Sequence, residues 1–343
     1  MKKKYLIIGP APNKDPKTHG GTPVLLNQLL SYLKDKDRDF IFIQTIYFGE
    51  KKRVSNYIYV LYMLFKSIKK VDIVMINVSS TGAYFLAPVV LFISKIFKKK
   101  FVFRRFAGNC IELYESSSLW KRKLMDYIIN YADILLYEPK YLVDYFSKKS
   151  ARVYWFPNSR IKSNIIRDTA RPYQKKFIFL GEVRQGKGVD EILKASESLD
   201  ETYTIDIYGT MHYDSKYTKD LFNKYVNVNY RGVLNHDDVY QKLSEYDVLL
   251  LPSYQEGYPG VIIEAFAVGL PIIATNLSSI KEMTDKKCSI LIDSKNVEQL
   301  VNAIKVFNES NFEEYSRNSL KMFNNYEQKH VHEKLIYICE ENQ

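Results

Sequence analysis

The strongest constraint on the fold is a regular alternation of short apolar runs with longer amphipathic segments along the chain. In the first half, the candidate strands are YLIIG, FIFIQTI, VDIVMINV, KFVFRRF, DILLYE and VYWFP. The candidate helices between them are TPVLLNQLLSYL, YIYVLYMLFKSI, AYFLAPVVLFISKIF, WKRKLMDYIINYA and a short segment near Tyr141–Ser147. Strands that alternate with helices are joined by crossover connections and therefore pair in parallel. We expect an α/β fold built on doubly wound parallel sheets.

The alternation is interrupted once and then resumes. Residues 158–176 are mainly polar and include Pro172, which is typical of a linker. A second series of candidate strands follows, namely FIFLGEV, YTIDIYG, VNVNYRG, DVLLLPS, PIIAT and SILID. A length of 343 residues also fits two domains. We therefore predict two Rossmann-like domains, residues 1–160 and 161–325, that face each other across a cleft, with residues 326–343 forming a helix that packs back on the first domain.

Cysteine content and hydropathy restrict the cellular setting. The three cysteines, Cys110, Cys288 and Cys339, are too scattered for a disulfide framework or a CxxC metal site, which favours a reducing, cytoplasmic compartment. The opening MKKKYLIIGP has too short an apolar run for a signal peptide and is interpreted as a first strand. The longest apolar stretch, residues 83–97, falls short of the about 20 residues of a membrane-spanning helix. We expect a buried helix there.

Charge is unevenly divided between the two halves. Residues 1–170 hold 30 Lys and Arg against 13 Asp and Glu, whereas residues 171–343 hold 20 against 26. A basic half attracts an anionic membrane surface, a lipid diphosphate or a nucleic acid. Basic clusters at residues 69–70, 98–100 and 104–105 adjoin apolar segments, which suits contact with an anionic membrane surface; a solvated charged face is the equal alternative. No nucleic-acid module is recognisable, and the aromatic residues do not alternate with basic ones.

The strongest local motif is PSYQEGYPGVIIEAFAVGLPIIAT, residues 252–275. A strand ends at Pro252, Glu256 lies in the loop, a helix begins near Val261, and Glu264 lies about one turn into it. A helix start offers unpaired N–H groups and partial positive charge to a diphosphate, and carboxylates accept hydrogen bonds from sugar hydroxyls. Together these groups predict a nucleotide-sugar site that also uses the neighbouring backbone: Gly257, Gly260, Val261 and Ile262. An ordinary turn with a dipole-stabilised glutamate is the alternative.

This segment resembles the E-x7-E motif of glycosyltransferase family 4, and EAFAVGLPIIAT matches that family's continuation E-A-x-A-x-G-x-P-[IV]-I-A-T. The resemblance implies a GT-B fold, retaining transfer without a required metal or other cofactor, and a nucleotide-sugar donor, with a UDP-sugar favoured. It places the donor on residues 161–325 and the acceptor, a glycan or polyprenyl-diphosphate-linked sugar, on residues 1–160. In this reading, Glu264 binds the nucleotide and Glu256 positions the donor sugar.

A second patch, FLGEVRQGKGVDEILKA at residues 179–195, resembles the family's cationic loop after the first strand of the nucleotide domain. Lys187 matches the family's lysine, which neutralises the donor diphosphate. Glu182 stands where the family has an arginine, so we predict that Arg184 supplies the guanidinium. Weaker matches are IYG, which ends at Gly209, and RGVL, which begins at Arg231 and corresponds to the loop against the nucleotide base. Surface charges in a turn are the alternative for Arg184.

The first half matches the family loosely. The opening GPAPNKDPKTHGGTPVLL places Gly20 and Gly21 where backbone approaches the diphosphate, whereas His19 beside them is interpreted as incidental. Many family members carry a sugar-contacting histidine after the strand equivalent to KFVFRRF, but this chain has FAGN. Arg105 and Asn109 are therefore the candidates for that contact. PNSR at residues 157–160 resembles the family's hinge and is interpreted as structural.

Three functions are consistent with these features. The leading hypothesis is a cytoplasmic transferase, peripheral on the inner face of the cell membrane, that builds a surface polysaccharide or glycolipid. A nucleotide-sugar epimerase of the same fold is an alternative and would use acid–base residues instead of a second substrate. A basic nucleic-acid-binding protein is the alternative from another class. The first hypothesis depends on Glu256 and Glu264, and finding them buried as plain ion pairs would count against it.

Overall fold

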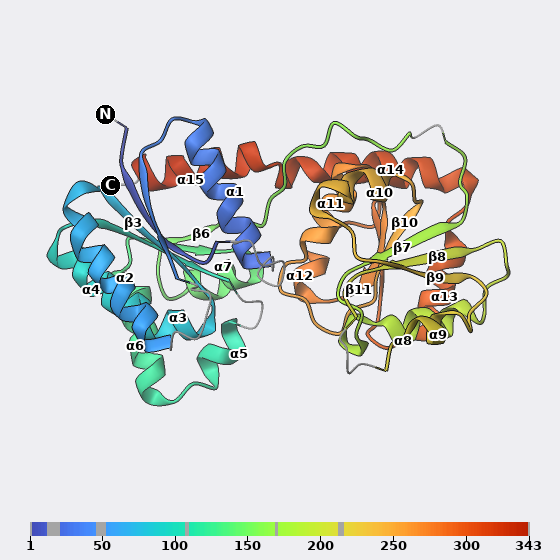
Figure 1. Ribbon diagram of the computed structural model, residues 1–343, viewed down its shortest axis with the longest axis horizontal. Coiled ribbons are helices and arrows are strands. Elements are labelled where there is room, and N and C mark those ends of the chain that lie inside the picture. The colour runs from blue at the N-terminus through green and yellow to red at the C-terminus, as the bar shows by residue number, and fades with distance from the viewer. Residues whose placement is uncertain are drawn as a thin grey trace. The chain divides into compact units, whose positions relative to one another are not determined.

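The computed structural model describes residues 2–11, 21–45, 53–106, 110–168, 171–211 and 216–341. The chain forms two compact units (Figure 1). Unit 1 comprises residues 1–158 together with residues 329–343, and unit 2 comprises residues 159–328. The C-terminal segment thus returns to the unit in which the chain begins.

Unit 1 contains one six-stranded sheet in the order β2-β1-β3-β4-β5-β6, and every pair in it is parallel. Its strands are β1 (Tyr5–Gly9), β2 (Phe40–Gln44), β3 (Ile73–Val78), β4 (Lys100–Arg105), β5 (Ile134–Tyr137) and β6 (Val153–Trp155). Its helices are α1 (Gly21–Asp35), α2 (Arg53–Ser67), η2 (Ile68–Lys70), α3 (Ser80–Phe85), α4 (Ala87–Ile96), α5 (Cys110–Glu115), α6 (Leu119–Tyr131), α7 (Lys140–Ser147) and α15 (Gln328–Glu341).

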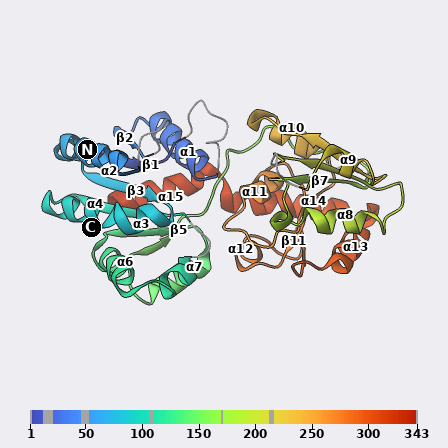
Figure 2. The ribbon, with the colours of Figure 1, turned by 60° about the horizontal axis from the view of Figure 1, so that its bottom comes forward.

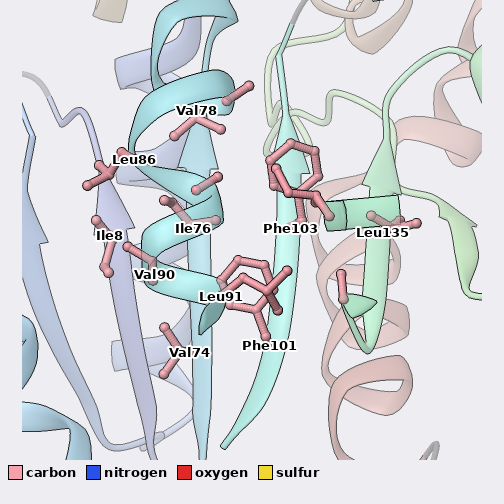
Figure 3. Packing of buried hydrophobic residues seen from close by; sticks show 14 of the residues in the cluster. Ile8, Val74, Ile76, Val78, Leu86, Val90, Leu91, Phe101, Phe103 and Leu135 are labelled. Carbon is pink, nitrogen blue, oxygen red and sulfur yellow. The ribbon is translucent and has the colours of Figure 1, made fainter. Parts of the chain in front are cut away.

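One face of this sheet is covered by α2, α3, α4, α6 and α7. Figure 3 shows α4 lying over β3, with Val90 and Leu91 directed toward Val74, Ile76 and Phe101 of the sheet. All six residues of β3 are buried, which is typical of a parallel strand covered on both sides. The continuous apolar runs of the sequence therefore reflect a sheet between two helix layers.

The other face is covered by α1 and α15. In α15, Val331, Leu335 and Ile338 recur at helical spacing and pack in the same cluster as Tyr5 and Ile7 of β1. Polar contacts hold the same helix: Lys100 Nζ donates to the Cys339 carbonyl at 2.9 Å, and Arg38 pairs with Glu340 at 2.9 Å. The last helix is therefore an integral part of unit 1.

A buried histidine in α15 makes the stability of unit 1 dependent on pH. His332 is 2% exposed, and its ring lies 4.9 Å from that of Tyr32 and 5.8 Å from that of Phe156. Burial, and then the nearby Arg104, lower its pKa from 6.5 to about 3. Because an unfolded chain binds a proton at His332 below about pH 6.5 and the folded chain does not, stability falls as the pH drops from there toward 3.

We therefore expect His332→Phe to reduce the loss of stability that occurs as the pH falls. Circular dichroism melts between about pH 7 and about pH 4.5 measure it, as the fall in melting temperature over that interval. His330→Phe, a change at a neighbouring exposed position of the same helix, is the control. An identical fall in wild type and in His332→Phe would contradict the assignment.

The expectation of a buried helix over residues 83–97 is correct for the inner face of α4, but the segment is not one continuous helix. The segment forms α3 and α4, which are separate helices joined at Leu86, and Pro88 lies in the first turn of α4, where its missing N–H is tolerated. Only the inner face is buried, whereas Phe85, Val89, Phe92 and Ile96 are between 40% and 60% exposed. Within the described residues, no helix has both the length and the apolar character to cross a membrane.

Unit 2 contains a second six-stranded parallel sheet in the order β12-β11-β10-β7-β8-β9 (Figure 1). Its strands are β7 (Lys176–Leu180), β8 (Thr204–Tyr208), β9 (Val228–Gly232), β10 (Val248–Leu251), β11 (Ile272–Thr275) and β12 (Ser289–Ile292). Its helices are η3 (Gln185–Lys187), α8 (Val189–Ser196), α9 (Lys219–Phe222), η4 (His236–Asp238), α10 (Val239–Ser244), α11 (Gly260–Ala267), α12 (Ser278–Lys281), α13 (Val297–Val306), α14 (Glu309–Phe323) and η5 (Asn324–Tyr326). The strand order reverses between β7 and β10, which is the switch point where doubly wound sheets bind ligands.

The buried carboxylate of Asp247 binds the segment that precedes β7. Asp247 is fully buried just before β10, and its Oδ1 accepts from Arg167 and from Arg171 at 2.8 Å each. Its Oδ2 accepts from the backbone N–H groups of Gln174 and Lys176 at 2.9 Å each. This carboxylate therefore bonds to the segment that precedes β7 and to the first residue of β7.

Candidate functional site

Two loops meet at the switch point of unit 2. One follows β7 and contains Lys187, and the other follows β10 and contains Glu256. The N–H of Tyr254 donates to the carbonyl of Gly186 at 2.9 Å, which ties the loops together. Gly188 has φ +77°, and a Cβ there would lie 2.1 Å from the carbonyl oxygen of Pro252. Only glycine therefore permits this approach without displacing backbone.

The contact between these loops is an ion pair of two predicted site residues. Lys187 Nζ donates to Glu256 Oε1 at 2.6 Å, and the side chains are 20% and 9% exposed. Ser279 Oγ donates to the Glu256 carbonyl at 3.0 Å, which fixes the loop from the other side. A partly desolvated cation and carboxylate thus lie side by side at the carboxyl edge of the sheet.

The start of α11 adds a second source of positive potential. The helix begins at Gly260, as the sequence predicts near Val261, and its N-cap is Pro259, which provides no side-chain cap. Gly260 and Val261 are partly exposed, whereas Ile262 is buried on the inner face. The first N–H groups of a helix have no intrahelical acceptor and carry about half a positive charge between them. This end of α11 therefore suits an anionic group such as a phosphate.

The second glutamate is held by an arginine that the sequence analysis missed. Glu264 Oε1 accepts from Arg160 Nε at 2.6 Å, and the two side chains are 12% and 8% exposed. A Cβ on Gly260 would lie 1.8 Å from Arg160 Nη2, so the guanidinium packs directly on the helix start. Arg160 is fixed by backbone bonds to Tyr326 and Gln328. Arg160 thus orients Glu264, a role beyond the structural hinge expected for PNSR.

Both glutamates are thus ion-paired, which is the arrangement named above as evidence against a ligand site. Two observations distinguish them from plain buried ion pairs. The partner of Glu256 is Lys187, itself a predicted diphosphate ligand, and this pair joins the loops that follow β7 and β10. Arg160, the partner of Glu264, packs on Gly260 at the uncapped start of α11. A phosphate at that helix start would compete with Glu256 for Lys187, because both are anions that the same ammonium can reach.

The remaining candidates of unit 2 are spread more widely. Arg184 is 48% exposed and pairs with Glu182 at 2.7 Å, so the predicted guanidinium is held by the residue that stands in the family's arginine position. Arg231 lies at the end of β9, the edge strand, and its Nε is 3.1 Å from Asp206. Gly209, buried after β8, donates its N–H to the Gly232 carbonyl at 2.8 Å. Gly257 lies in the Glu256 loop and is partly exposed.

Fewer candidates of unit 1 can be placed. Gly21 is the first residue of α1, and a Cβ there would meet no atom within 4 Å. Gly20, His19 and Asn109 lie outside the described residues. Arg105 ends β4 at 1% exposure, 5.6 Å from the Tyr84 ring, and its three guanidinium nitrogens have no hydrogen-bond partner in the described part of the chain.

Metal ligands and reactive thiols do not gather at this site. In the part of the chain that the structure describes, no cluster of three His, Cys, Asp or Glu residues could hold a metal ion. The three cysteines are free and buried. Burial raises the pKa of Cys110 to about 11 and that of Cys288 to about 12, so neither thiol is activated.

The two-sheet architecture matches solved structures of GT-B glycosyltransferases. Sucrose-phosphate synthase from Thermosynechococcus elongatus superposes with a TM-score of 0.74 at 14% identity over 97% of each chain. HepE from Anabaena, solved in complex with UDP, gives a TM-score of 0.73 at 12% identity over 98% of each chain. At these identities the likeness establishes the fold, which is the α/β GT-B architecture predicted from the sequence.

Sequence comparison finds a match to a known family over part of the chain. Residues 174–308, which contain the switch-point loops and α11, match the model of the glycosyl transferases group 1 family. An uncharacterised 41.2 kDa protein from the cps region of Klebsiella pneumoniae is 26% identical over 75% of this chain and 76% of its own length. The putative teichuronic acid biosynthesis glycosyltransferase TuaC of Bacillus subtilis is 29% identical over 43% of this chain and 36% of its own length.

Proposed function

We propose that the protein is a retaining glycosyltransferase that moves a sugar from a UDP-sugar onto an acceptor in surface polysaccharide or glycolipid synthesis. The observation that carries the proposal is the convergence of Lys187, Glu256 and the uncapped start of α11 at the switch point of unit 2. The family match over this segment supports transferase chemistry. Relatives named for teichuronic acid and O-antigen biosynthesis support the pathway class, and the UDP held by HepE supports the donor.

The proposed mechanism assigns one role to each group. The donor diphosphate lies at the start of α11, where the helix N–H groups and Lys187 neutralise it. Glu264, oriented by Arg160, accepts hydrogen bonds from the ribose hydroxyls, and Glu256 accepts from hydroxyls of the donor sugar. Lys187 exchanges its bond to Glu256 for a bond to a phosphate oxygen when the donor binds.

The transfer itself needs no further protein base. The bond between the anomeric carbon and the diphosphate oxygen breaks, and the acceptor hydroxyl oxygen bonds to the same face of that carbon. The acceptor proton passes to the departing diphosphate oxygen, whose developing charge Lys187 and α11 stabilise. We propose that no metal takes part, because the lysine and the helix start provide the positive charge that a metal would otherwise supply.

Unit 1 is the proposed acceptor side. Its excess of Lys and Arg fits a polyprenyl-diphosphate-linked sugar or a glycan brought to an anionic membrane surface. We accordingly place the protein in the cytoplasm, peripheral on the inner face of the cell membrane, with no nucleic-acid partner.

A binding experiment tests the nucleotide assignment. We expect Glu264→Gln to raise the Kd for UDP at least about tenfold, since a charge-assisted bond to ribose hydroxyls contributes roughly 1.5–3 kcal/mol. The amide oxygen still accepts from Arg160, so the fold is preserved. Isothermal titration with UDP measures the effect, and Glu313→Gln, at an exposed position of α14, is the matched control. Unchanged UDP affinity in Glu264→Gln would remove this residue from the site.

The reaction class is tested separately. A thermal-shift screen of nucleotide sugars identifies the donor, because a ligand that binds only the native state raises the melting temperature. We expect the donor alone to remain unchanged apart from slow hydrolysis, and a glycosylated product to form when a membrane extract supplies the acceptor. Interconversion of the sugar in the absence of an acceptor would instead identify an epimerase.

A further inference from the structure

We infer that the outer face of α2, α3 and α4, together with the first turn of α6, is a membrane-docking surface that inserts an apolar stripe into an anionic bilayer. We call it the docking face. It rests on the peripheral association proposed above and specifies which residues make it. It predicts insertion of side chains, in addition to attraction between charges.

The docking face consists of large apolar side chains at helical spacing. On α2 they are Ile58, Tyr59, Tyr62 and Phe65, between 41% and 64% exposed. On α3 and α4 they are Phe85, Val89, Phe92 and Ile96, between 40% and 60% exposed. On α6 they are Leu119 and Trp120, at 77% and 51%. Single exposed apolar residues are ordinary, but a stripe along consecutive helices marks a binding surface.

These helices present one continuous surface. The rings of Phe65 and Phe97 lie 6.4 Å apart, which joins the C-terminal ends of α2 and α4. The rings of Phe85 and Trp120 lie 6.0 Å apart, which joins α3 to the start of α6. Figure 2 shows α2, α3 and α4 along one side of unit 1. The inner faces of the same helices pack in a common core, so the stripe is the side that no described element covers.

Charge around the α2, α3 and α4 part of the docking face is mainly positive. From residue 53 to residue 97 the sole acidic residue is Asp72, and it accepts a bond from the Lys4 N–H. Exposed or partly exposed basic side chains adjoin the apolar stripe, namely Lys66, Lys69, Lys70, Lys98, Lys99, Lys121 and Lys123. Lys121 Nζ lies 5.4 Å from the Trp120 ring, a pairing of cation and aromatic that suits the headgroup layer.

This charge pattern favours a bilayer over a second copy of the chain. In a symmetric dimer through this face, the lysine rims would meet each other and repel. An anionic bilayer neutralises the lysines while its acyl boundary accepts the apolar side chains. Because the inner faces of these helices are held in the core, the helices lie in the plane of the interface and do not cross it.

The test is binding of the full chain to lipid vesicles without nucleotide. We expect wild type to sediment with vesicles of phosphatidylcholine and phosphatidylglycerol and to bind pure phosphatidylcholine weakly. Phe92→Ser/Ile96→Ser should lower the partition coefficient at least about tenfold, because it removes apolar insertion and keeps every charge. Val226→Ser/Val233→Ser, at 81% and 66% exposed positions of unit 2, is the matched control and should bind as wild type does.

A charge variant separates the electrostatic contribution to vesicle binding from the apolar one. Lys69→Gln/Lys70→Gln/Lys98→Gln should weaken binding to anionic vesicles and leave the weak binding to neutral ones unchanged. Lys100 is left intact because it anchors α15. Binding that survives Phe92→Ser/Ile96→Ser undiminished would overturn the inference. So would a wild-type dimer in lipid-free solution that the same variant dissociates, as measured by light scattering.

Failure of the membrane-docking inference is distinguishable from failure of the proposed glycosyltransferase function. The variants of the docking face lie in unit 1, whereas the nucleotide site lies in unit 2. We therefore expect Phe92→Ser/Ile96→Ser to bind UDP with wild-type affinity. Loss of vesicle binding with retained UDP binding supports the docking face. Loss of UDP binding in this variant would show a general folding defect, and the inference would then fail.

Discussion

Replacing Lys187 by Met is expected to lower kcat about 100- to 1000-fold, the usual effect of removing one charge-stabilising group at a transition state. Lys187 Nζ donates to Glu256 Oε1 at 2.6 Å and neutralises this carboxylate. The substitution therefore removes a cation from the proposed diphosphate site and also leaves the Glu256 carboxylate unpaired. Steady-state kinetics with the donor found in the thermal-shift screen measures the loss.

The ion pair makes the effects of Lys187 and Glu256 non-additive. We expect Glu256→Gln alone to reduce turnover and to spare UDP affinity, because its proposed contact is with the sugar. The double variant should retain more donor affinity than Lys187→Met alone, since it lacks the unpaired carboxylate. Lys194→Met, at an exposed position of α8, is the control. Wild-type kcat in Lys187→Met would exclude the lysine from the site.

Replacing Asp247 by Ala is expected to reduce the free energy of unfolding of unit 2 by about 3–5 kcal/mol, the cost of leaving buried charges without their partner. Asp247 accepts from two arginines and two backbone N–H groups, and it is fully buried. Burial lowers the pKa of Arg167, whereas its bond to Asp247 raises it. Removing the carboxylate thus leaves the buried Arg167 guanidinium without its ion-pair partner. It also removes the acceptor of the backbone N–H groups at the start of β7.

The placement of the tryptophans gives this experiment an internal control. Trp120 and Trp155 are the two tryptophans of the chain, and both lie in unit 1. Circular dichroism should therefore report the earlier unfolding of unit 2 in Asp247→Ala, while the tryptophan fluorescence transition stays near that of wild type. Asp200→Asn, at an exposed position, should leave both transitions in place. Equal stability of Asp247→Ala and wild type would contradict the role given to the carboxylate.

The parts of the fold that could be predicted are those with a local signature. The short apolar runs became parallel strands because both faces of each sheet are covered, so whole strands such as β3 are apolar. Lys187 and Glu256 could be expected near each other because each follows a strand and the carboxyl ends of parallel strands share one edge. Helix α14 was not predicted, since two serines interrupt its buried apolar face between Phe312 and Phe323, and Ser316 donates to the Gly269 carbonyl at 2.6 Å.

Other features depend on contacts between distant residues. The role of Arg160 depends on Glu264, far along the chain, and no local pattern in PNSR indicates that partner. The outward face of α4 was misjudged because hydropathy counts apolar residues and does not reveal how many the core can accept. The bond between Arg184 and Glu182 is equally unpredictable, since neighbouring charges in a loop can pair with each other or face a ligand.

The return of α15 to unit 1 has a consequence for biosynthesis. Strand β1 precedes unit 2 in the chain, yet part of its apolar cover, Val331, Leu335 and Ile338, follows unit 2. Unit 2 is complete in sequence at residue 328, before that cover exists. A nascent chain therefore leaves part of this sheet face uncovered until α15 has been translated, so unit 2 can fold before the sheet of unit 1 is fully covered.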